Sequence, residues 1–190
     1  MTWSDRSAAA SPARRFRRLT PEARAATLVE AGFACLARGG ITAFTVDNIC
    51  REAMTSRGLI GHHFRSKDGL LAAVYAEAYR RTLAGLVVGE ESSCELADLI
   101  ERAIAGDGAD PATLRVWLAL WGEVAVNPEL AAEHRKQYAR YRVTLAGAIA
   151  RLADRRSLDV DAGLLAGSLI ALIDGLWLER GLAPDMMSTD

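Results

Sequence analysis

Apolar residues recur at intervals of three and four along most of the chain, between glycines, prolines and short polar runs. This spacing predicts amphipathic helices. We find no strict apolar–polar alternation of the kind that marks a half-buried strand, and no internal repeat. With 190 residues, 51% of them hydrophobic, the chain can bury a substantial core. The sequence therefore predicts an all-α fold.

Ser and Thr residues suited to helix N-caps mark out four helices in the N-terminal half. They are Thr20, Thr45, Ser56 and Ser66. We expect Gly39 and Gly40 to end the first helix and the third to end near His63. The fourth starts at Lys67 and reaches about Val88. Further helices are predicted at 93–106, 111–126, 129–154 and 160–181.

Two of these helices are short and separated by a tight break at Met54 and Thr55, with longer helices before and after. This is the arrangement of a helix-turn-helix DNA-binding head. We expect a disordered basic arm at 1–19, a helix-turn-helix domain at 20–66 and a helical domain at 67–190. The arm either is idle in solvent or follows DNA phosphates.

Charge is unevenly distributed along the chain. Residues 1–81 carry 13 Lys and Arg against 7 Asp and Glu, whereas residues 82–190 carry 10 against 17. A basic N-terminal part on an acidic body indicates that one part contacts a polyanion.

The three cysteines, Cys35, Cys50 and Cys94, lack CxxC spacing, which favours buried reduced thiols over disulfides or a zinc site. No secretory signal and no uncharged run of about 18 apolar residues is visible. We expect a cytoplasmic protein with no membrane partner, no metal and no cofactor.

The segment SRGLIGHHFRSKDGLL, which starts at Ser56, combines glycines, adjacent histidines and basic residues. A helix in the major groove needs small residues for close approach and polar side chains for contacts. If Leu59 and Ile60 turn inward, then Arg57 and its neighbours at 61 and 62 face outward.

Two residues flank this outward face. Ser56, at a helix N-terminus, and Lys67 offer contacts to phosphates. His62 and His63 project about 100° apart on a helix, which disfavours joint metal chelation. No GxxxxGK[ST] motif is present, which disfavours a nucleotide-phosphate cradle.

The stretch TVDNICREAMTSRGLIGHHFRSKDGLL resembles the helix-turn-helix signature of the TetR family of bacterial transcription regulators. The matching residues are Thr45, Ile49, Ala53, Ser56, Gly58, Phe64, Lys67 and Leu70. For His63 the resemblance implies a DNA-backbone contact, and partial burial beside Phe64 is the alternative. The expected DNA-binding residues are Thr45, Ser56, Arg57, Gly58, Gly61, His62, His63 and Lys67.

Three residues depart from the family pattern. Cys50 replaces Ala and can pack similarly. Met54 replaces the glycine of the turn, where a left-handed conformation would cost about 1 kcal/mol, so we expect either a strained Met54 or a slightly reshaped turn. Gly61 replaces a commonly larger residue, which leaves more of the base reading to Arg57 and His62.

Tryptophans and a carboxylate recur at helical spacing in the C-terminal half. Trp117 and Trp121 are four residues apart, and Asp174 and Trp177 are three apart. If the two segments converge, these side chains can form a box for an organic cation. The alternative is that the aromatic residues are ordinary core or interface residues.

The segments LRVWLALWGEVAVNPEL and LIALIDGLWLERG resemble the C-terminal domain of the BetI-type branch of the TetR family. The resemblance runs from about Leu114 to Leu182. Choline-responsive members of this branch repress genes of glycine betaine synthesis. A choline-like or other cationic small-molecule effector is therefore implied.

The segment 160–181 is apolar nearly all round, so it must be covered on both sides. Members of the family use their last two long helices as a four-helix dimer interface. This implies that 129–154 and 160–181 form a homodimer, with two heads on a pseudo-palindromic double-stranded DNA operator. Gly163, Gly167 and Ser168 would allow close helix approach.

The leading interpretation is a dimeric, ligand-responsive transcriptional repressor and not an enzyme. No nucleophile, base and orienting group can be placed together from their spacing. The alternative is a helical protein-interaction module that has lost DNA binding, which only Met54 and Gly61 encourage. The sequence leaves open the effector, the operator and whether binding represses or activates.

Overall fold

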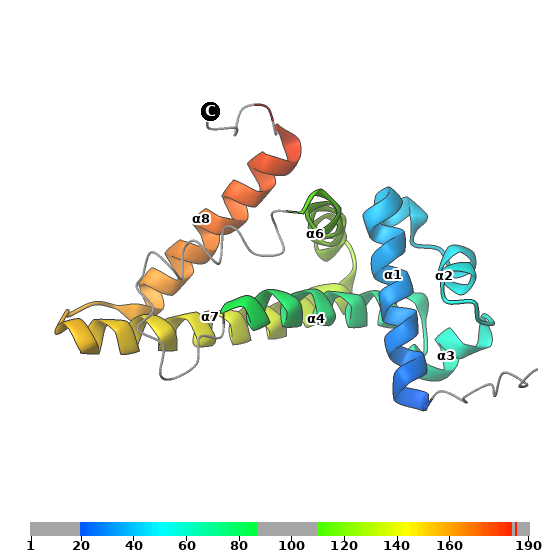
Figure 1. The fold of residues 1–190 in the computed structure, drawn as a ribbon, viewed down its shortest axis with the longest axis horizontal. Helices are drawn as coiled ribbons and strands as arrows, with labels where there is room; N and C mark the ends of the chain where they lie inside the picture. The colour runs from blue at the N-terminus through cyan, green and yellow to red at the C-terminus, as the bar shows by residue number, and fades with distance from the viewer. Residues whose placement is uncertain (1–19, 87–109, 184, 186–190) are drawn as a thin grey trace, which may run out of the picture.

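The computed structural model describes residues 20–86, 110–183 and 185. Within these residues the chain forms seven α-helices and no strand, which confirms the all-α prediction (Figure 1). They are α1 (Pro21–Ala43), α2 (Val46–Glu52), α3 (Gly58–Phe64), α4 (Lys67–Leu86), α6 (Pro111–Val124), α7 (Pro128–Arg156) and α8 (Ala162–Leu182). The arm at 1–19, the helix predicted at 93–106 and Cys94 lie outside the described residues.

The first helix begins where the sequence predicts but does not end there. The Thr20 hydroxyl accepts a hydrogen bond from the Ala23 amide at 3.2 Å. Gly39 and Gly40 leave the helical conformation, and Gly40 has a φ of 61°, which a glycine adopts without steric cost. The chain then resumes one helical turn to Ala43, so the two glycines kink α1 and do not end it.

The two short helices differ in how they begin. Thr45 caps α2 as predicted, because its hydroxyl accepts from the Asn48 amide at 3.2 Å. Ser56 does not cap α3, and that prediction is wrong. Arg57 occupies the N-cap position with helical backbone angles and no side-chain cap. The Ser56 carbonyl instead accepts from the Leu59 amide, so a backbone turn replaces the expected side-chain cap.

The helices form two parts, which we call the head (α1, α2 and α3) and the body (α4, α6, α7 and α8). Figure 1 shows the head at one end of the long α4–α7 pair. The Ser66 hydroxyl accepts from the Gly69 amide at 2.8 Å and so begins α4, as predicted. Helix α4 packs against α7 within the body and against α1 and α3 of the head. It therefore links the two parts.

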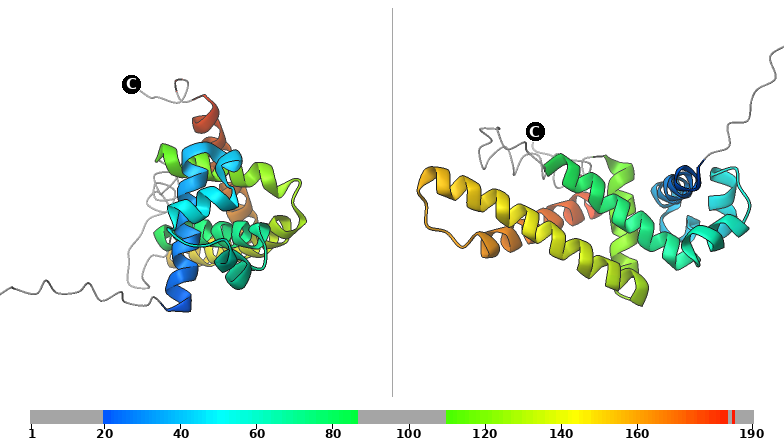
Figure 2. Two further views of the ribbon diagram at one scale, coloured as in Figure 1. Left: turned by 90° about the vertical axis from the view of Figure 1, so that its right-hand side faces the viewer. Right: turned by 90° about the horizontal axis from the view of Figure 1, so that it is seen from below.

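The body helices are capped by acceptors that the sequence places just before prolines or apolar runs. Asp110, Asn127 and Asp161 accept hydrogen bonds from the first-turn amides of α6, α7 and α8. Helix α8 contacts both α7 and α6 (Figure 2). A Cβ on Gly181 would lie 2.7 Å from Leu118 Cδ1, so glycine permits the close approach of α8 to α6. One continuous apolar core joins head and body.

Candidate functional site

Helix α3 presents the face that the sequence assigns to DNA. Ile60 is buried and Leu59 is half-buried against the core. Gly61 and His62 are exposed on the opposite side. The inward and outward positions predicted for this helix are therefore confirmed. A Cβ on Gly61 would meet nothing within 4 Å, so the missing side chain leaves open space on this face.

Arg57 lies just before α3 and is paired with an acid of α2. One of its guanidinium nitrogens, Nη2, lies 2.5 Å from the Asp47 carboxylate, and both side chains are largely exposed. Exposed ion pairs contribute on the order of 0 to 1 kcal/mol. Arg57 can therefore leave Asp47 for a base or phosphate at little cost.

The other predicted DNA-binding residues lie at the start of α2, just before or within α3, and at the start of α4. Thr45, Ser56, Gly58 and Lys67 are exposed. His63 is half-buried, with its ring centroid 6.2 Å from that of Phe64 and 4.9 Å from that of His62. Its position agrees with either of the two roles expected for it.

Met54 adopts the left-handed conformation expected for the turn. Its φ is 49°, and its side chain is 93% exposed, so no packing compensates the strain. The predicted strain at Met54 is confirmed. Arg65, at the end of α3, also has a positive φ of 67°, and the sequence pattern did not indicate it.

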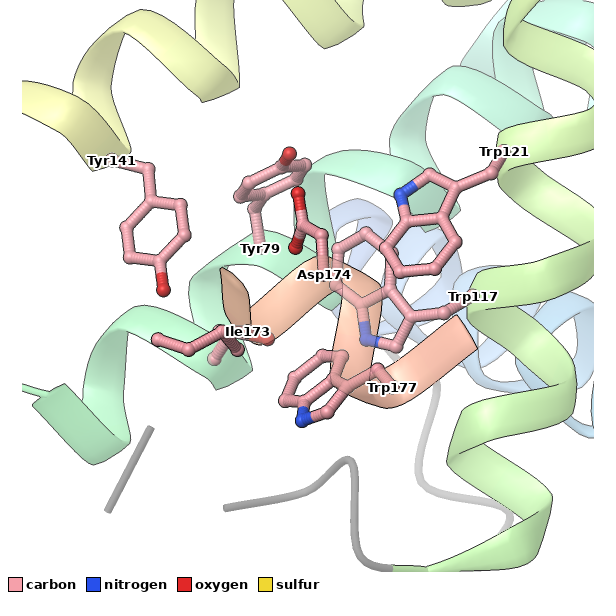
Figure 3. A pocket seen from close by; sticks show the side chains of 8 residues that line it. Tyr79, Trp117, Trp121, Tyr141, Ile173, Asp174 and Trp177 are labelled. Atoms are coloured by element: carbon pink, nitrogen blue, oxygen red, sulfur yellow. The ribbon is translucent and has the colours of Figure 1, made fainter. Parts of the chain in front are cut away.

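The body contains a small cavity that brings the predicted cation-binding side chains together. Trp117 and Trp121 reach it from α6, and Asp174 and Trp177 reach it from α8. Its free volume is about 10 Å³, on the order of one water molecule. The two segments therefore converge, as a cation box requires. We call this cavity the cage (Figure 3).

Aromatic rings line the cage on several sides. The ring centroid of Trp117 lies 5.7 Å from that of Trp121 and 6.2 Å from that of Trp177. Tyr79 of α4 meets Trp117 edge-on at 5.0 Å, and Tyr141 of α7 lies 6.2 Å from Tyr79. Such rings provide the electron-rich faces that attract an organic cation.

Asp174 is the acidic group of the cage. Figure 3 shows its carboxylate pointing among the aromatic side chains of α4 and α6. No Lys or Arg is among the described residues that line the cage. Burial raises the pKa of Asp174 to about 6. The carboxylate therefore loses solvation without gaining a cationic partner from the lining residues.

Two further polar atoms at the cage are buried without partners. The Thr82 hydroxyl and the Trp177 indole nitrogen make no hydrogen bond in the part of the chain that the structure describes. Buried polar atoms are normally satisfied, and exceptions call for a ligand, a water or a functional role. Both residues line the cage, so its wall contains two side chains with an unused hydrogen-bonding group.

Comparisons with known proteins identify the family. Residues 28–74 match the family described as bacterial regulatory proteins, tetR family, and residues 94–190 match the C-terminal domain of BetI-type transcriptional repressors. The chain belongs to the TetR family. It is thus a ligand-responsive, DNA-binding transcriptional regulator with a BetI-type C-terminal domain.

Individual relatives of this TetR-family regulator agree with that assignment. The HTH-type transcriptional regulator BetI of Burkholderia mallei (strain NCTC 10229) is 28% identical over 173 residues, which cover 88% of this chain and 87% of the relative. A transcriptional regulator of Pseudomonas aeruginosa PAO1 is 39% identical, with a TM-score of 0.70 and coverage of 90% and 85%. A regulator of Saccharomonospora viridis, solved in complex with choline, is 28% identical, with a TM-score of 0.66 and coverage of 86% and 88%.

Sequence reasoning missed half of the cage of this TetR-family regulator. The missed lining residues are Tyr79, Thr82, Tyr141 and Ile173. Tyr75 and Tyr79 are four residues apart on α4, a spacing like that of Trp117 and Trp121. That signal was available, but only the packing of α4 on α7 brings Tyr79 and Tyr141 to the same side as the tryptophans.

Helix α8 carries an exposed apolar face as well as its two cage residues. Leu164, Leu172 and Leu182 are each more than half exposed. By length and composition alone α8 would suffice to cross a membrane, with 22% of its most apolar window buried. In a TetR-family regulator the same apolar face suits the dimer interface that the family forms.

Proposed function

We propose that this TetR-family regulator is a homodimeric repressor in the cytoplasm, released from its operator by a small organic cation of the quaternary ammonium class. The observation that carries the proposal is the half-buried Asp174 side chain, whose carboxylate lies among aromatic rings with no Lys or Arg among the described lining residues. A quaternary ammonium supplies the missing charge and has no N–H donor to satisfy. Aromatic faces replace the water that it leaves.

The choline-bound relative supports this ligand class. At 28% identity over most of both chains, with a TM-score of 0.66, the Saccharomonospora viridis regulator has a similar fold. In the present chain Trp117, Trp121, Asp174 and Trp177 are the proposed ligand-binding residues. They come from α6 and α8, which both lie within the residues that match the BetI-type C-terminal domain.

The small volume of the cage means that ligand binding must change the conformation of the body. The free volume of about 10 Å³ holds no more than a water molecule, so a trimethylammonium group must displace side chains or helices to enter. Tyr79 belongs to α4, which also packs against the head. Movement of α4 would change the separation of the two heads in the dimer. A 100-fold loss of operator affinity requires about 2.7 kcal/mol of coupling.

We propose that the chain is divided as the sequence indicates, with a DNA-binding domain at 20–66 and an effector-binding and dimerisation domain at 67–190. The exposed side of α3 enters the major groove of a pseudo-palindromic operator. Arg57 and His62 read bases there, while Lys67 contacts a phosphate. The other proposed contacts to DNA are Thr45, Ser56, Gly58, Gly61 and His63.

The test is a titration with charged ligands and a neutral isostere. Calorimetry would compare tetramethylammonium, choline, betaine aldehyde and 3,3-dimethyl-1-butanol, which has the shape of choline without its charge. We expect choline to bind at least about tenfold more tightly than the neutral alcohol. Fluorescence anisotropy with the protein's own upstream DNA would then show release on addition of the cations.

Variants locate the site. Asp174→Asn should abolish the preference for choline over the alcohol, because the carboxylate is replaced by a neutral group of the same shape. Glu179→Gln, on the exposed surface of the same helix, should leave that preference unchanged. If no cation binds, or if both variants behave alike, the cage is not a cation site and its tryptophans are core residues.

A further inference from the structure

A second cavity lies where the head meets the body. Its volume is about 170 Å³. Phe33 of α1, Arg81 of α4 and Thr113 of α6 form part of its wall, together with Ala78. The helices α1 and α6 that flank it pack directly against each other. Unlike the cage, this cavity is large enough for a guest without rearrangement.

The second cavity and the cage are neighbours. Trp117 and Thr82 line both of them, so one indole and one hydroxyl form the boundary. The Thr82 hydroxyl is buried and has no hydrogen-bond partner in the described part of the chain. A ligand that extends from the cage past Thr82 could place an oxygen beside this hydroxyl and its remaining atoms in the second cavity.

We propose that the second cavity binds the tail of a chain-extended quaternary ammonium ligand, of the class of short-chain acyl esters of choline. This inference rests on the proposed function of the cage, which holds the ammonium group. The ester oxygens lie a few bonds from the ammonium and would meet the Thr82 hydroxyl. The acyl chain then packs between the rings of Phe33 and Trp117.

The polar groups of the second cavity favour a neutral tail over a carboxylate. Arg81 is its one described basic side chain, and Arg81 already donates from Nε to Glu77 at 2.8 Å and from Nη2 to Glu30. Its guanidinium also lies 4.5 Å from the ring centroid of Phe33. An anionic tail would therefore approach two carboxylates that have already paired with this arginine.

The volume fits a short acyl group. Apolar protein cavities of about 150 Å³ accept guests the size of benzene. A butyryl group is about the size of benzene. Each additional methylene that becomes buried raises affinity about fourfold. Two added methylenes, from acetyl to butyryl, should therefore raise affinity by about 15-fold.

The cavity's place in the fold gives the tail a regulatory effect. Phe33 belongs to the head, whereas Thr113 and Trp117 belong to the body. A tail between them contacts both sides of the junction. Esters with longer tails should therefore alter the position of the head more than choline does, and should release DNA more completely at saturation.

Calorimetry with the full chain tests the inference. The ligands are tetramethylammonium, choline, acetylcholine, butyrylcholine and carnitine, whose tail ends in a carboxylate. We expect butyrylcholine to bind about 15-fold more tightly than acetylcholine and carnitine to gain nothing over choline. Thr113→Leu, which fills the second cavity, should remove the advantage of butyrylcholine and leave choline binding within twofold. Thr113→Ser, which enlarges the cavity, should keep that advantage.

The outcomes of these titrations distinguish a failure of the tail site from a failure of the proposed cation site. If choline binds but lengthening the ester gives no gain, or if Thr113→Leu weakens all ligands equally, the second cavity takes no tail and only the cage proposal stands. Ala78→Val fills the same cavity from α4 and replaces Thr113→Leu if that variant fails to bind choline. If none of the cations binds, the cage proposal and this inference both fail.

Discussion

Arg81 of α4 is paired with Glu30 of α1, and the residue that follows Arg81, Thr82, lines both the cage and the second cavity. The pair therefore joins the wall of the proposed effector site to the head. An ion pair of this exposure contributes no more than about 1 kcal/mol, but that is a large part of the coupling that an effector needs.

Glu30→Gln should weaken the coupling between choline binding and operator binding without weakening choline binding itself. We expect choline to bind within twofold of its usual affinity, while the ratio of operator affinities without and with choline falls about threefold. The matched control is Glu52→Gln, which breaks the Arg38–Glu52 pair between two helices of the head. An equal loss of coupling in both variants would show that the Arg81–Glu30 pair does not specifically transmit effector binding to the head.

Lys67→Ala should weaken operator binding in a way that does not depend on sequence. Lys67 is exposed at the first turn of α4, and a phosphate contact releases about one counterion. We expect the slope of log affinity against log salt to become shallower by about one unit in anisotropy titrations. Lys136→Ala, at an exposed lysine of α7, should leave the slope unchanged. An unchanged slope for Lys67→Ala would remove the phosphate assignment.

Asp174→Asn should stabilise the fold while it destroys the proposed cation site. The pKa of Asp174 is about 6 in the folded protein, above its value near 4 in an unfolded chain. Between these pH values the folded protein binds more protons, so stability falls as the pH rises from 4 to 6. The penalty is fully present at pH 7, and the asparagine removes about 2 kcal/mol of it.

Denaturant melts at pH 4 and pH 7 would check this prediction. The free energy of unfolding of Asp174→Asn should exceed that of the unmodified chain at pH 7 and approach it near pH 4. Choline, which binds the ionised carboxylate more tightly than the protonated one, should lose affinity as the pH falls below 6, until it binds no more tightly than the neutral alcohol. A variant that is less stable at pH 7 would mean that Asp174 has a cationic partner in the folded protein.

Met54→Gly should stabilise the turn between α2 and α3. The backbone of Met54 has a φ of 49°, which glycine adopts without the steric cost of a side chain, and the exposed methionine makes little packing that could be lost. We expect a gain of about 1 kcal/mol in the free energy of unfolding. Met54→Ala keeps the Cβ and should give no such gain, so equal effects of the two variants would contradict the strain.

Leu172→Glu should convert the dimer to a monomer and weaken operator binding. Leu172 is 56% exposed on α8, and a carboxylate there would be buried unpaired at the proposed interface. Light scattering after size-exclusion chromatography measures the mass directly. Val126→Glu, an equally drastic change at a residue that is 75% exposed after α6, should remain dimeric. A dimeric Leu172→Glu protein would place the interface elsewhere.

Local patterns predicted the parts of this fold that depend on neighbouring residues. Thr20, Thr45 and Ser66 cap helices as their side chains indicate. Ser56 does not, because the chain at Arg57 is already helical and a backbone bond takes the place of the cap. Side-chain chemistry alone cannot decide between these two ways to start a helix.

In the cage too, residues on one helix could be predicted from the sequence, whereas residues brought together by the packing of different helices could not. Helical spacing identified the tryptophans of α6 and the Asp174–Trp177 pair, because each pair lies on a single helix. Tyr79 and Tyr141 come from helices whose packing is fixed by contacts far apart in sequence. The pairing of Arg57 with Asp47 is of the same kind, since it depends on the turn between two helices.

The small free volume of the cage also determines how quickly the protein can respond. With room for only about one water molecule, the aromatic side chains must part before a trimethylammonium group can enter. Opening is then a first-order step that precedes binding, so the observed rate of association should reach a plateau as the ligand concentration rises. At high ligand concentration, the rate at which the protein senses its effector would therefore be set by the opening of the cage and would not depend on the ligand concentration.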